Sequence, residues 1–262
     1  MTPGIDARLG RISTSGRFLT VPMDHGITMG PVAGLVDLES TVAAVTRGGA
    51  DAVLTQKGLA ERVHPNRNEA GYVVHANAST TVGPDGNDKR QTATAREAVR
   101  AGGDAVSFHV NVGSDSEPGQ IEGLSSLTRE AHDLGLPVLA MAYARGPRVE
   151  EDGPQHLAHA VRFAEELGAD VVKTGYSGDA ESFERVCAAT AKPVVIAGGS
   201  RGTDRQTVEM VRGAMDAGAA GVSMGRSIFQ HEEPELITRA VSAVVHGDAG
   251  ADAALSEAGL AE

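Results

Sequence analysis

Short apolar runs recur along the whole chain, separated by longer segments in which apolar residues fall at helical spacing. Before the run at 171, for example, Leu157, Val161, Ala164 and Leu167 fall on one helical face. Near-continuous apolar strands that alternate with such helices are typical of a parallel sheet covered by helices. The pattern predicts eight strands, at 18–23, 52–55, 72–75, 105–109, 138–142, 171–173, 194–197 and 221–224.

Four of these strands are preceded by a similar glycine motif. The copies begin at Gly48, Gly102, Gly168 and Gly218. The motif predicts a helix that ends at a left-handed glycine, followed by a short turn into a buried strand. Turn-forming residues replace the helical pattern in much of the segment 56–92, which is therefore predicted to form irregular loops over one face of the sheet.

Eight such units in 262 residues favour a closed (β/α)8 barrel over an open, doubly wound sheet. An open sheet would be favoured by a dinucleotide-binding fingerprint, and no G-x-G-x-x-G follows the first predicted strand. We therefore expect one α/β domain, a single (β/α)8 barrel, over 1–262. Residues 1–16 are expected to cap the barrel floor and residues 247–262 to form a C-terminal tail.

Composition and charge restrict the possible functions. The formal net charge of −12 repels a polyanionic backbone, so nucleic acid is not expected as a partner. No apolar run approaches the roughly 18 residues of a spanning helix, and the N-terminus lacks a signal-peptide pattern. We expect no membrane partner and a cytoplasmic location. The single cysteine, Cys187, excludes an intramolecular disulfide and a cysteine-based metal cluster.

Lysine is scarce in this chain, which has four lysines and 19 arginines. Lys173 closes the sixth predicted strand. A lysine amine can lose its proton and attack a carbonyl, whereas arginine stays charged, so Lys173 is a candidate Schiff-base nucleophile. The alternative is an exposed lysine at a strand end. Lys57 is a second candidate, ranked lower because it follows the polar pair Thr55 and Gln56.

Polar residues gather at the predicted carboxyl ends of the strands, where (β/α)8 barrels carry their active sites. Asp24 and Tyr143 are candidate general acid/base groups for iminium chemistry at Lys173. The structural alternatives are a turn cap for Asp24 and an aromatic lid over the core for Tyr143. His25 and His109 are candidates for contact with substrate.

The last two predicted strands end in glycine-rich loops that suit a phosphate group. Gly198 and Gly199 follow one strand, and Gly225 and Arg226 follow the other. Glycine lets backbone amides approach an anion, and the arginine adds charge. Simple tight turns are the alternative. A ketose phosphate held there would present its carbonyl to Lys173.

A metal site is a further alternative. Asp24, His25, His75 and His109 lie at the ends of three predicted strands, and a zinc-dependent aldolase or hydrolase would use such ligands. No H-x-H or H-E-x-x-H spacing supports this set. We therefore expect no metal and no other cofactor.

Taken together, these residues make the chain resemble the archaeal-type class I aldolase family, from about residue 19 to about residue 246. The motifs that carry the resemblance are VPMDHG at 21–26, VSFHVNVG at 106–113, YARG at 143–146, VVKT at 171–174, AGG at 197–199 and VSMGRSIFQ at 222–230. The resemblance implies a Schiff base on Lys173, proton handling by Asp24 and general acid/base catalysis by Tyr143. It implies phosphate binding by Gly198, Gly199, Gly225 and Arg226.

The family includes fructose-bisphosphate aldolases, aminodideoxyheptulosonate synthases, and aldolases that join dihydroxyacetone phosphate to aspartate semialdehyde. Ala144 stands where the family commonly has proline, and Ala142 where fructose-bisphosphate members tend to be bulkier. The stretch 108–114 is closer to the heptulosonate-synthase branch, whose acceptor is L-aspartate semialdehyde. Arg145 is expected to pair with the carboxylate of that acceptor.

The resemblance therefore implies a Schiff-base aldolase whose donor is dihydroxyacetone phosphate or a deoxy-ketohexose phosphate and whose acceptor is L-aspartate 4-semialdehyde. The expected product is an amino-keto heptanoate or heptulosonate for aromatic or aminohydroxybenzoate biosynthesis. The alternatives are a class I fructose-bisphosphate aldolase and, from another class, a non-catalytic phospho-sugar-binding barrel. The many small residues on the outer helices lead us to expect a homo-oligomer.

Overall fold

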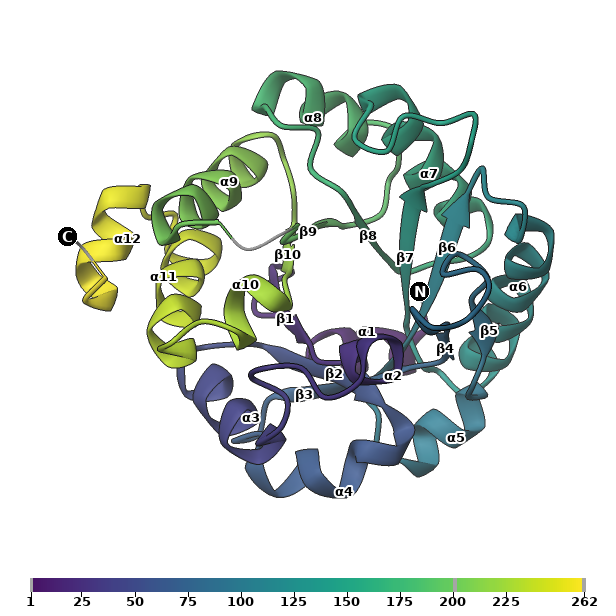
Figure 1. Ribbon diagram of the computed structural model, residues 1–262, viewed down its shortest axis with the longest axis horizontal. Coiled ribbons are helices and arrows are strands. Elements are labelled where there is room, and N and C mark those ends of the chain that lie inside the picture. The colour runs from purple at the N-terminus through teal and green to yellow at the C-terminus, as the bar shows by residue number, and fades with distance from the viewer. Residues whose placement is uncertain (1, 200–201, 261–262) are drawn as a thin grey trace.

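A closed barrel of eight parallel strands forms the centre of the computed structural model, which describes residues 2–199 and 202–260 (Figure 1). The strands follow each other round the barrel in the order β1-β10-β9-β8-β7-β6-β3-β2. Their bounds are β1 (Phe18–Pro22), β2 (Ala52–Gln56), β3 (Gly71–His75), β6 (Ala105–Val112), β7 (Val138–Ala144), β8 (Val171–Thr174), β9 (Val194–Ala197) and β10 (Gly221–Ser223). The predicted (β/α)8 barrel and its eight strands are confirmed.

Most of the helices form a ring around the strands (Figure 1). Among the described residues, none of the helices is both long and apolar enough to cross a membrane. The helices are α1 (Pro3–Leu9), α2 (His25–Met29), α3 (Leu38–Arg47), α4 (Ala60–Val63), α5 (Ala95–Arg100), α6 (Glu117–Asp133), α7 (Pro154–Glu166), α8 (Ala180–Cys187), α9 (Asp204–Asp216), α10 (Arg226–Phe229), α11 (Pro234–Gly247) and α12 (Ala251–Ala258), with short 3-10 turns η1 (Lys57–Leu59) and η2 (His64–Asn66).

Side chains alternate along each strand between the barrel interior and the surrounding helices. The interior holds its own buried cluster, which is separate from the larger core between strands and helices. In β7 the inward residues are Leu139 and Met141, with Tyr143 packed against the same cluster, and in β8 Val171 is inward. Lys173 has the same parity as Val171, so it lies one layer above a packed core.

The N-terminal segment lies across the amino-terminal ends of the strands. Ile12 is completely buried in the interior cluster. Arg11 pairs with Asp104, just before β6, at 2.6 Å, and Arg8 donates to the carbonyl oxygen of Gly135 at 2.8 Å. The barrel interior is therefore closed at this end.

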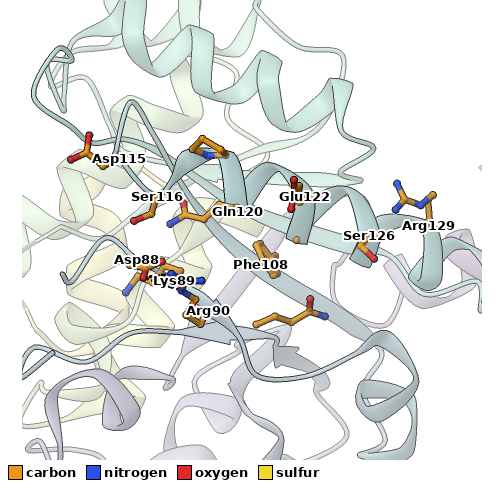
Figure 2. Close-up of a pocket in the computed structure, with 14 residues that line it drawn as sticks. Asp88, Lys89, Arg90, Phe108, Asp115, Ser116, Gln120, Glu122, Ser126 and Arg129 are labelled. Carbon is orange, nitrogen blue, oxygen red and sulfur yellow. Dashed lines mark hydrogen bonds and ion pairs between the residues drawn. The ribbon is translucent and has the colours of Figure 1, made fainter. Parts of the chain in front are cut away.

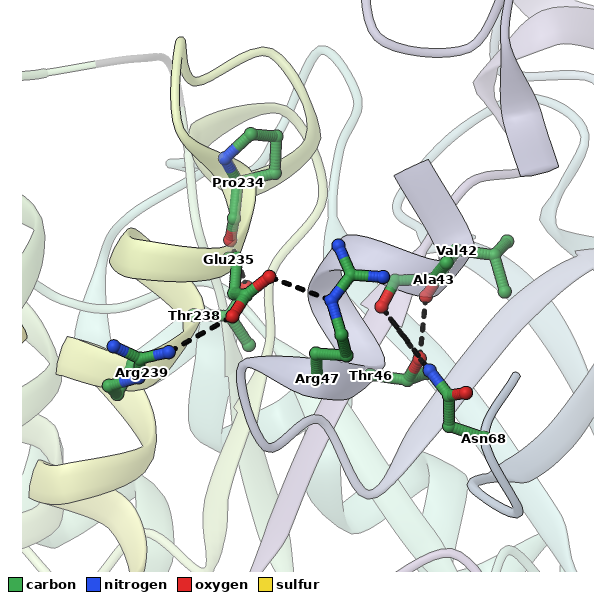
Figure 3. Close-up of polar contacts among 9 residues, drawn as sticks. All are labelled: Val42, Ala43, Thr46, Arg47, Asn68, Pro234, Glu235, Thr238 and Arg239. Carbon is green, nitrogen blue, oxygen red and sulfur yellow. Dashed lines mark hydrogen bonds and ion pairs between the residues drawn. The ribbon is translucent and has the colours of Figure 1, made fainter. Parts of the chain in front are cut away.

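Helices α3 and α11 meet where the barrel closes. β1 pairs with β10, and α3 packs against α11. Arg47 donates to the Glu235 carboxylate at 2.8 Å, and Glu235 also pairs with Arg239 at 3.0 Å (Figure 3). A Cβ at Gly48 would lie 2.5 Å from the carbonyl oxygen of Glu235, so only glycine allows this approach. Exposed ion pairs contribute little to the stability of the fold. The close approach of Gly48 to the Glu235 backbone therefore determines how α3 and α11 pack at this seam.

The segment 56–92 is more regular than expected, because short helical turns and a small sheet interrupt the predicted loops on either side of the predicted strand 72–75. η1, α4 and η2 occupy the part after β2. After β3, β4 (Asn77–Ala78) and β5 (Arg90–Gln91) form a two-stranded antiparallel sheet. Elements of two to four residues are too short to leave a hydrophobic period in the sequence.

Two barrel strands extend at least two residues beyond their predicted ends. β6 runs on to Val112 and β7 to Ala144, so His109 and Tyr143 lie within strands. In the C-terminal segment, α12 packs against α9 and α11. Residues 261–262, the end of the expected tail, lie outside the described residues.

Candidate active site

A cavity of about 390 Å³ opens above β7, β8, β9 and β10 at their carboxyl ends. Asp24 and His109, which the sequence also proposes, do not line it and lie beside it. The predicted site residues that line the cavity are Lys173, Tyr143, Arg145, His25, Gly198, Gly199, Gly225 and Arg226. The barrel therefore brings together residues from five strand ends that are separated by up to about 200 positions in the chain.

Lys173 occupies the centre of this arrangement. Its neighbours in the sheet are Met141 of β7 and Val195 of β9. The side chain is only 7% exposed, although it lines the cavity. Among the described residues, no hydrogen bond or ion pair involves its Nζ. The amine is thus available to a carbonyl that enters the cavity.

Asp24 follows β1 and lies between two imidazole rings. His75 Nε2 is 3.6 Å from one carboxylate oxygen, and His25 Nδ1 is 3.7 Å from the other. Burial would raise the pKa of Asp24, but the charges of His75, His25 and Lys173 outweigh it and hold that pKa below its ordinary value. Asp24 is therefore an ionised carboxylate within electrostatic range of Lys173.

His75 is buried and neutral near pH 7. Its Nδ1 is 2.7 Å from Ser107 Oγ. Burial lowers the pKa of His75 to about 4, and the opposing effect of Asp24 is too small to restore it. The sequence analysis considered this residue only as a metal ligand. The bond to Ser107 depends on the register of β3 with β6, which the sequence does not reveal.

Tyr143 is held between two flat groups. The guanidinium carbon of Arg145 lies 4.6 Å from the centre of the phenol ring, and the His109 ring lies 5.0 Å from it. Arg145 also donates from Nε to Glu151 at 2.8 Å. Glu151 and Asp152 line the same cavity on the loop before α7, and no sequence pattern singles them out. This packing fixes the position of the tyrosine at the cavity wall.

The two glycine loops lie side by side. Arg226 donates to the carbonyl oxygen of Gly199 at 3.3 Å and so links them. A Cβ on Gly225 would lie 2.6 Å from His25 Cε1 and 2.9 Å from the carbonyl oxygen of Pro22, which explains the glycine. The Ser223 hydroxyl lines the cavity and is buried without a hydrogen-bond partner among the described residues. These donors suit a phosphate group.

The four residues of the metal alternative do not form one ligand cluster, although His25 and His75 both flank Asp24. His109 does not pair with Asp24, because its Nε2 lies 2.7 Å from Asn111 Oδ1. Burial and the charges of Lys89 and Arg145 hold the pKa of His109 well below its ordinary value. Over 2–199 and 202–260, no three histidine, cysteine, aspartate or glutamate side chains are close enough to hold a metal ion.

Lys57, the competing nucleophile, lies outside the cavity. Its Nζ pairs with Glu97 at 2.5 Å, in the turn that follows β2.

A larger groove of about 740 Å³ runs between β5 and α6 (Figure 2). Its lining includes none of the residues that the sequence proposes for catalysis.

Comparison with known proteins agrees with this geometry. Residues 18–231 match the family described as DeoC/LacD family aldolase. The chain is 64% identical over 257 residues to 2-amino-3,7-dideoxy-D-threo-hept-6-ulosonate synthase of Halobacterium salinarum, covering 98% of this chain and 97% of the relative. It is 37% identical over 248 residues to 2-amino-4,5-dihydroxy-6-oxo-7-(phosphonooxy)heptanoate synthase of Streptomyces griseus, covering 94% and 90%.

A solved structure of a Schiff base-forming fructose-1,6-bisphosphate aldolase is 29% identical, with a TM-score of 0.86 over 93% of this chain and 100% of that chain. Residues 18–231, which match the family, include all eight barrel strands and every residue named above around the cavity. The chain belongs to the DeoC/LacD family of aldolases.

Proposed function

We propose that this aldolase joins a ketose-phosphate donor to L-aspartate 4-semialdehyde through a Schiff base on Lys173. The observation that carries the proposal is the buried Lys173 amine, which shares one cavity with two glycine loops and Tyr143. A donor whose phosphate binds at Gly198, Gly199, Gly225 and Arg226 has its ketone near that amine. The donor is dihydroxyacetone phosphate or a deoxy-ketohexose phosphate.

The products named for the two synthases support the acceptor. Both are seven-carbon acids with an amino group at C2 and a ketone at C6. An aldol bond between C4 and C5 divides each into a three-carbon ketone unit and a four-carbon α-amino acid aldehyde. The amino-acid half is common to both names, whereas C7 carries a phosphate ester in one and no hydroxyl in the other. The shared half corresponds to aspartate 4-semialdehyde.

The chemistry divides among the site residues as follows. The Lys173 amine attacks the donor ketone, and loss of water from the carbinolamine leaves an iminium. With dihydroxyacetone phosphate, removal of a proton from the carbon next to the iminium gives an enamine. With a deoxy-ketohexose phosphate, cleavage of the C–C bond next to the iminium releases one half of the donor as an aldehyde and leaves the enamine. In both cases the enamine attacks the aldehyde carbon of the acceptor and forms the new C–C bond. Tyr143 donates a proton to the resulting alkoxide, and the Asp24 carboxylate accepts and returns protons beside the lysine. Water then hydrolyses the iminium and releases the product.

Substrate contacts complete the proposal. Arg145 pairs with the acceptor carboxylate, and His25 and His109 contact substrate from either side of the lysine. Fructose-bisphosphate aldolase activity is the second candidate, supported by the similarity to the Schiff base-forming aldolase. Both candidates use the same lysine and the same phosphate loops, and they differ in the aldehyde.

A comparison of two acceptors tests the proposal. Purified protein, kept in EDTA, is supplied with dihydroxyacetone phosphate and either aspartate semialdehyde or glyceraldehyde 3-phosphate, and the C–C-bonded product is quantified. We expect kcat/KM to be at least tenfold higher with aspartate semialdehyde. A preference of the same size for glyceraldehyde 3-phosphate would remove the amino-acid acceptor and leave the second candidate.

Assembly, domain organisation and location are part of the proposal. The many small residues on the outer helices support a homo-oligomer. The closed floor and the seam between α3 and α11 support one folding unit over 1–262, with 1–16 as its cap and 247–262 as its tail. The biosynthetic names of the relatives support a cytoplasmic enzyme with small-molecule substrates.

A further inference from the structure

Lys173, Arg226 and Lys89 are cationic side chains near the barrel mouth that have no carboxylate oxygen within 4.0 Å among the described residues. Their polar contacts are to neutral groups or absent. The proposed function, on which this inference rests, uses the first two for the ketone and the donor phosphate. Lys89 has no role in it and was not singled out by the sequence.

Lys89 lies at the end of a segment that crosses the barrel mouth. We define the strap as residues 79–89, between β4 and β5. At one side, Thr81 donates its amide to the carbonyl oxygen of Thr28 in α2, at 2.9 Å. At the other, the carbonyl oxygen of Asn87 accepts from Asn111 at 3.0 Å and from Gln120 at 2.5 Å. The strap therefore spans from α2 to the carboxyl end of β6.

The position of Lys89 on the strap is fixed. Its Nζ donates to Ser79 Oγ at 2.7 Å, across the hairpin. Figure 2 shows Lys89 beside Asp88 and Arg90, opposite Ser116 and Gln120 at the start of α6. Burial and the nearby charge of Arg145 lower the pKa of Lys89, while Asp24 and Asp85 raise it. A half-buried ammonium held by one neutral hydroxyl gains from an incoming anion.

The order of the strands indicates whether this anion belongs to the donor or to the acceptor. The donor phosphate occupies the loops after β9 and β10, and Lys173 lies on the next strand, β8. An aldehyde that attacks from the other side of the lysine lies over β7, β6 and β3. Lys89 and Arg145 are cations on this side of the lysine, and Arg145 is already paired with Glu151 at 2.8 Å.

We infer that Lys89 joins Arg145 in binding the anionic end of the acceptor, the α-carboxylate of aspartate semialdehyde. The strap thereby makes recognition of the acceptor separate from binding of the donor. A charge-assisted hydrogen bond of this kind contributes enough to change an affinity by about ten- to a hundredfold.

Lys89→Met tests this, with Lys192→Met as the matched control. Lys192 precedes β9 at the amino-terminal end of the barrel, far from the mouth. We expect Lys89→Met to raise the KM for aspartate semialdehyde about ten- to a hundredfold, with Lys89→Arg restoring most of the loss. Propanal, an acceptor without an anionic group, should react equally well with Lys89→Met and with the unmodified protein. Borohydride trapping of dihydroxyacetone phosphate should be unchanged.

Three outcomes would overturn the inference. Equal losses with aspartate semialdehyde and propanal would mean that Lys89 only supports the strap. No loss with either would mean that it does not contact the acceptor. A loss confined to glyceraldehyde 3-phosphate would assign Lys89 to a phosphate instead of a carboxylate. Failure of trapping in the unmodified protein is a separate result, since it would contradict the proposed function itself.

Discussion

At the scale of single residues, the charge states around Lys173 are set by burial and by close partners. Asp24 is ionised and His75 is neutral near pH 7, although the two side chains are only 3.6 Å apart. Sequence could single out Lys173 by its rarity and Asp24 by its place after a strand. It could not single out the pair of His75 and Ser107, because their contact depends on strand register.

The neutral state of His75 has a consequence for stability. Its pKa of about 4 in the folded protein lies below the ordinary value of 6.5, so the unfolded chain binds more protons between these values. Stability should therefore fall as pH decreases from about 6.5 towards 4. Urea unfolding at pH 7 and pH 5 measures this, and His75→Gln should lose about 2 kcal/mol less over that interval than the unmodified protein. An equal loss in both proteins would contradict the assignment.

At the scale of elements, the sequence specifies the barrel strands well, because each is a near-continuous apolar run and four of them follow a glycine motif that ends a helix. Since chemistry in such barrels lies at strand ends, most of the cavity lining follows from the strands alone. The strap, Glu151 and Asp152 do not follow. They lie on long connections whose paths depend on tertiary contacts such as the bonds of Asn87 to Asn111 and Gln120.

Gly225 lies between β10 and α10 and lines the cavity. A methyl group there would contact the Pro22 carbonyl oxygen, which is backbone and cannot rotate away. Gly225→Ala should therefore displace the loop that carries Arg226, raise the KM for dihydroxyacetone phosphate at least tenfold and cost about 1–3 kcal/mol of stability. Gly247→Ala, where a Cβ has no neighbour within 4 Å, is the control. An unchanged KM in Gly225→Ala would show that this loop does not bind the phosphate.

At the scale of the whole molecule, the barrel is closed at one end and reactive at the other. Ile12 belongs to the N-terminal segment, yet it is fully buried among interior residues of the strands. The floor and the strands should therefore unfold together. This coupling keeps a rigid layer beneath Lys173.

Ile12→Ala tests the coupling. The lost contacts should destabilise the protein by about 2–5 kcal/mol in a single cooperative transition, measured by urea unfolding. Val36→Ala, at a side chain that is 70% exposed, should change stability by less than about 0.5 kcal/mol. A loss below about 0.5 kcal/mol for Ile12→Ala, or a separate early transition, would mean that the floor segment frays independently.

The central claim is that the Lys173 amine forms a Schiff base with a phosphorylated ketone. Borohydride reduction in the presence of dihydroxyacetone phosphate and EDTA, followed by peptide mass mapping, tests it directly. The account predicts one adduct, on Lys173, and none in Lys173→Met. No adduct, an adduct on Lys57, or activity that EDTA abolishes would contradict it.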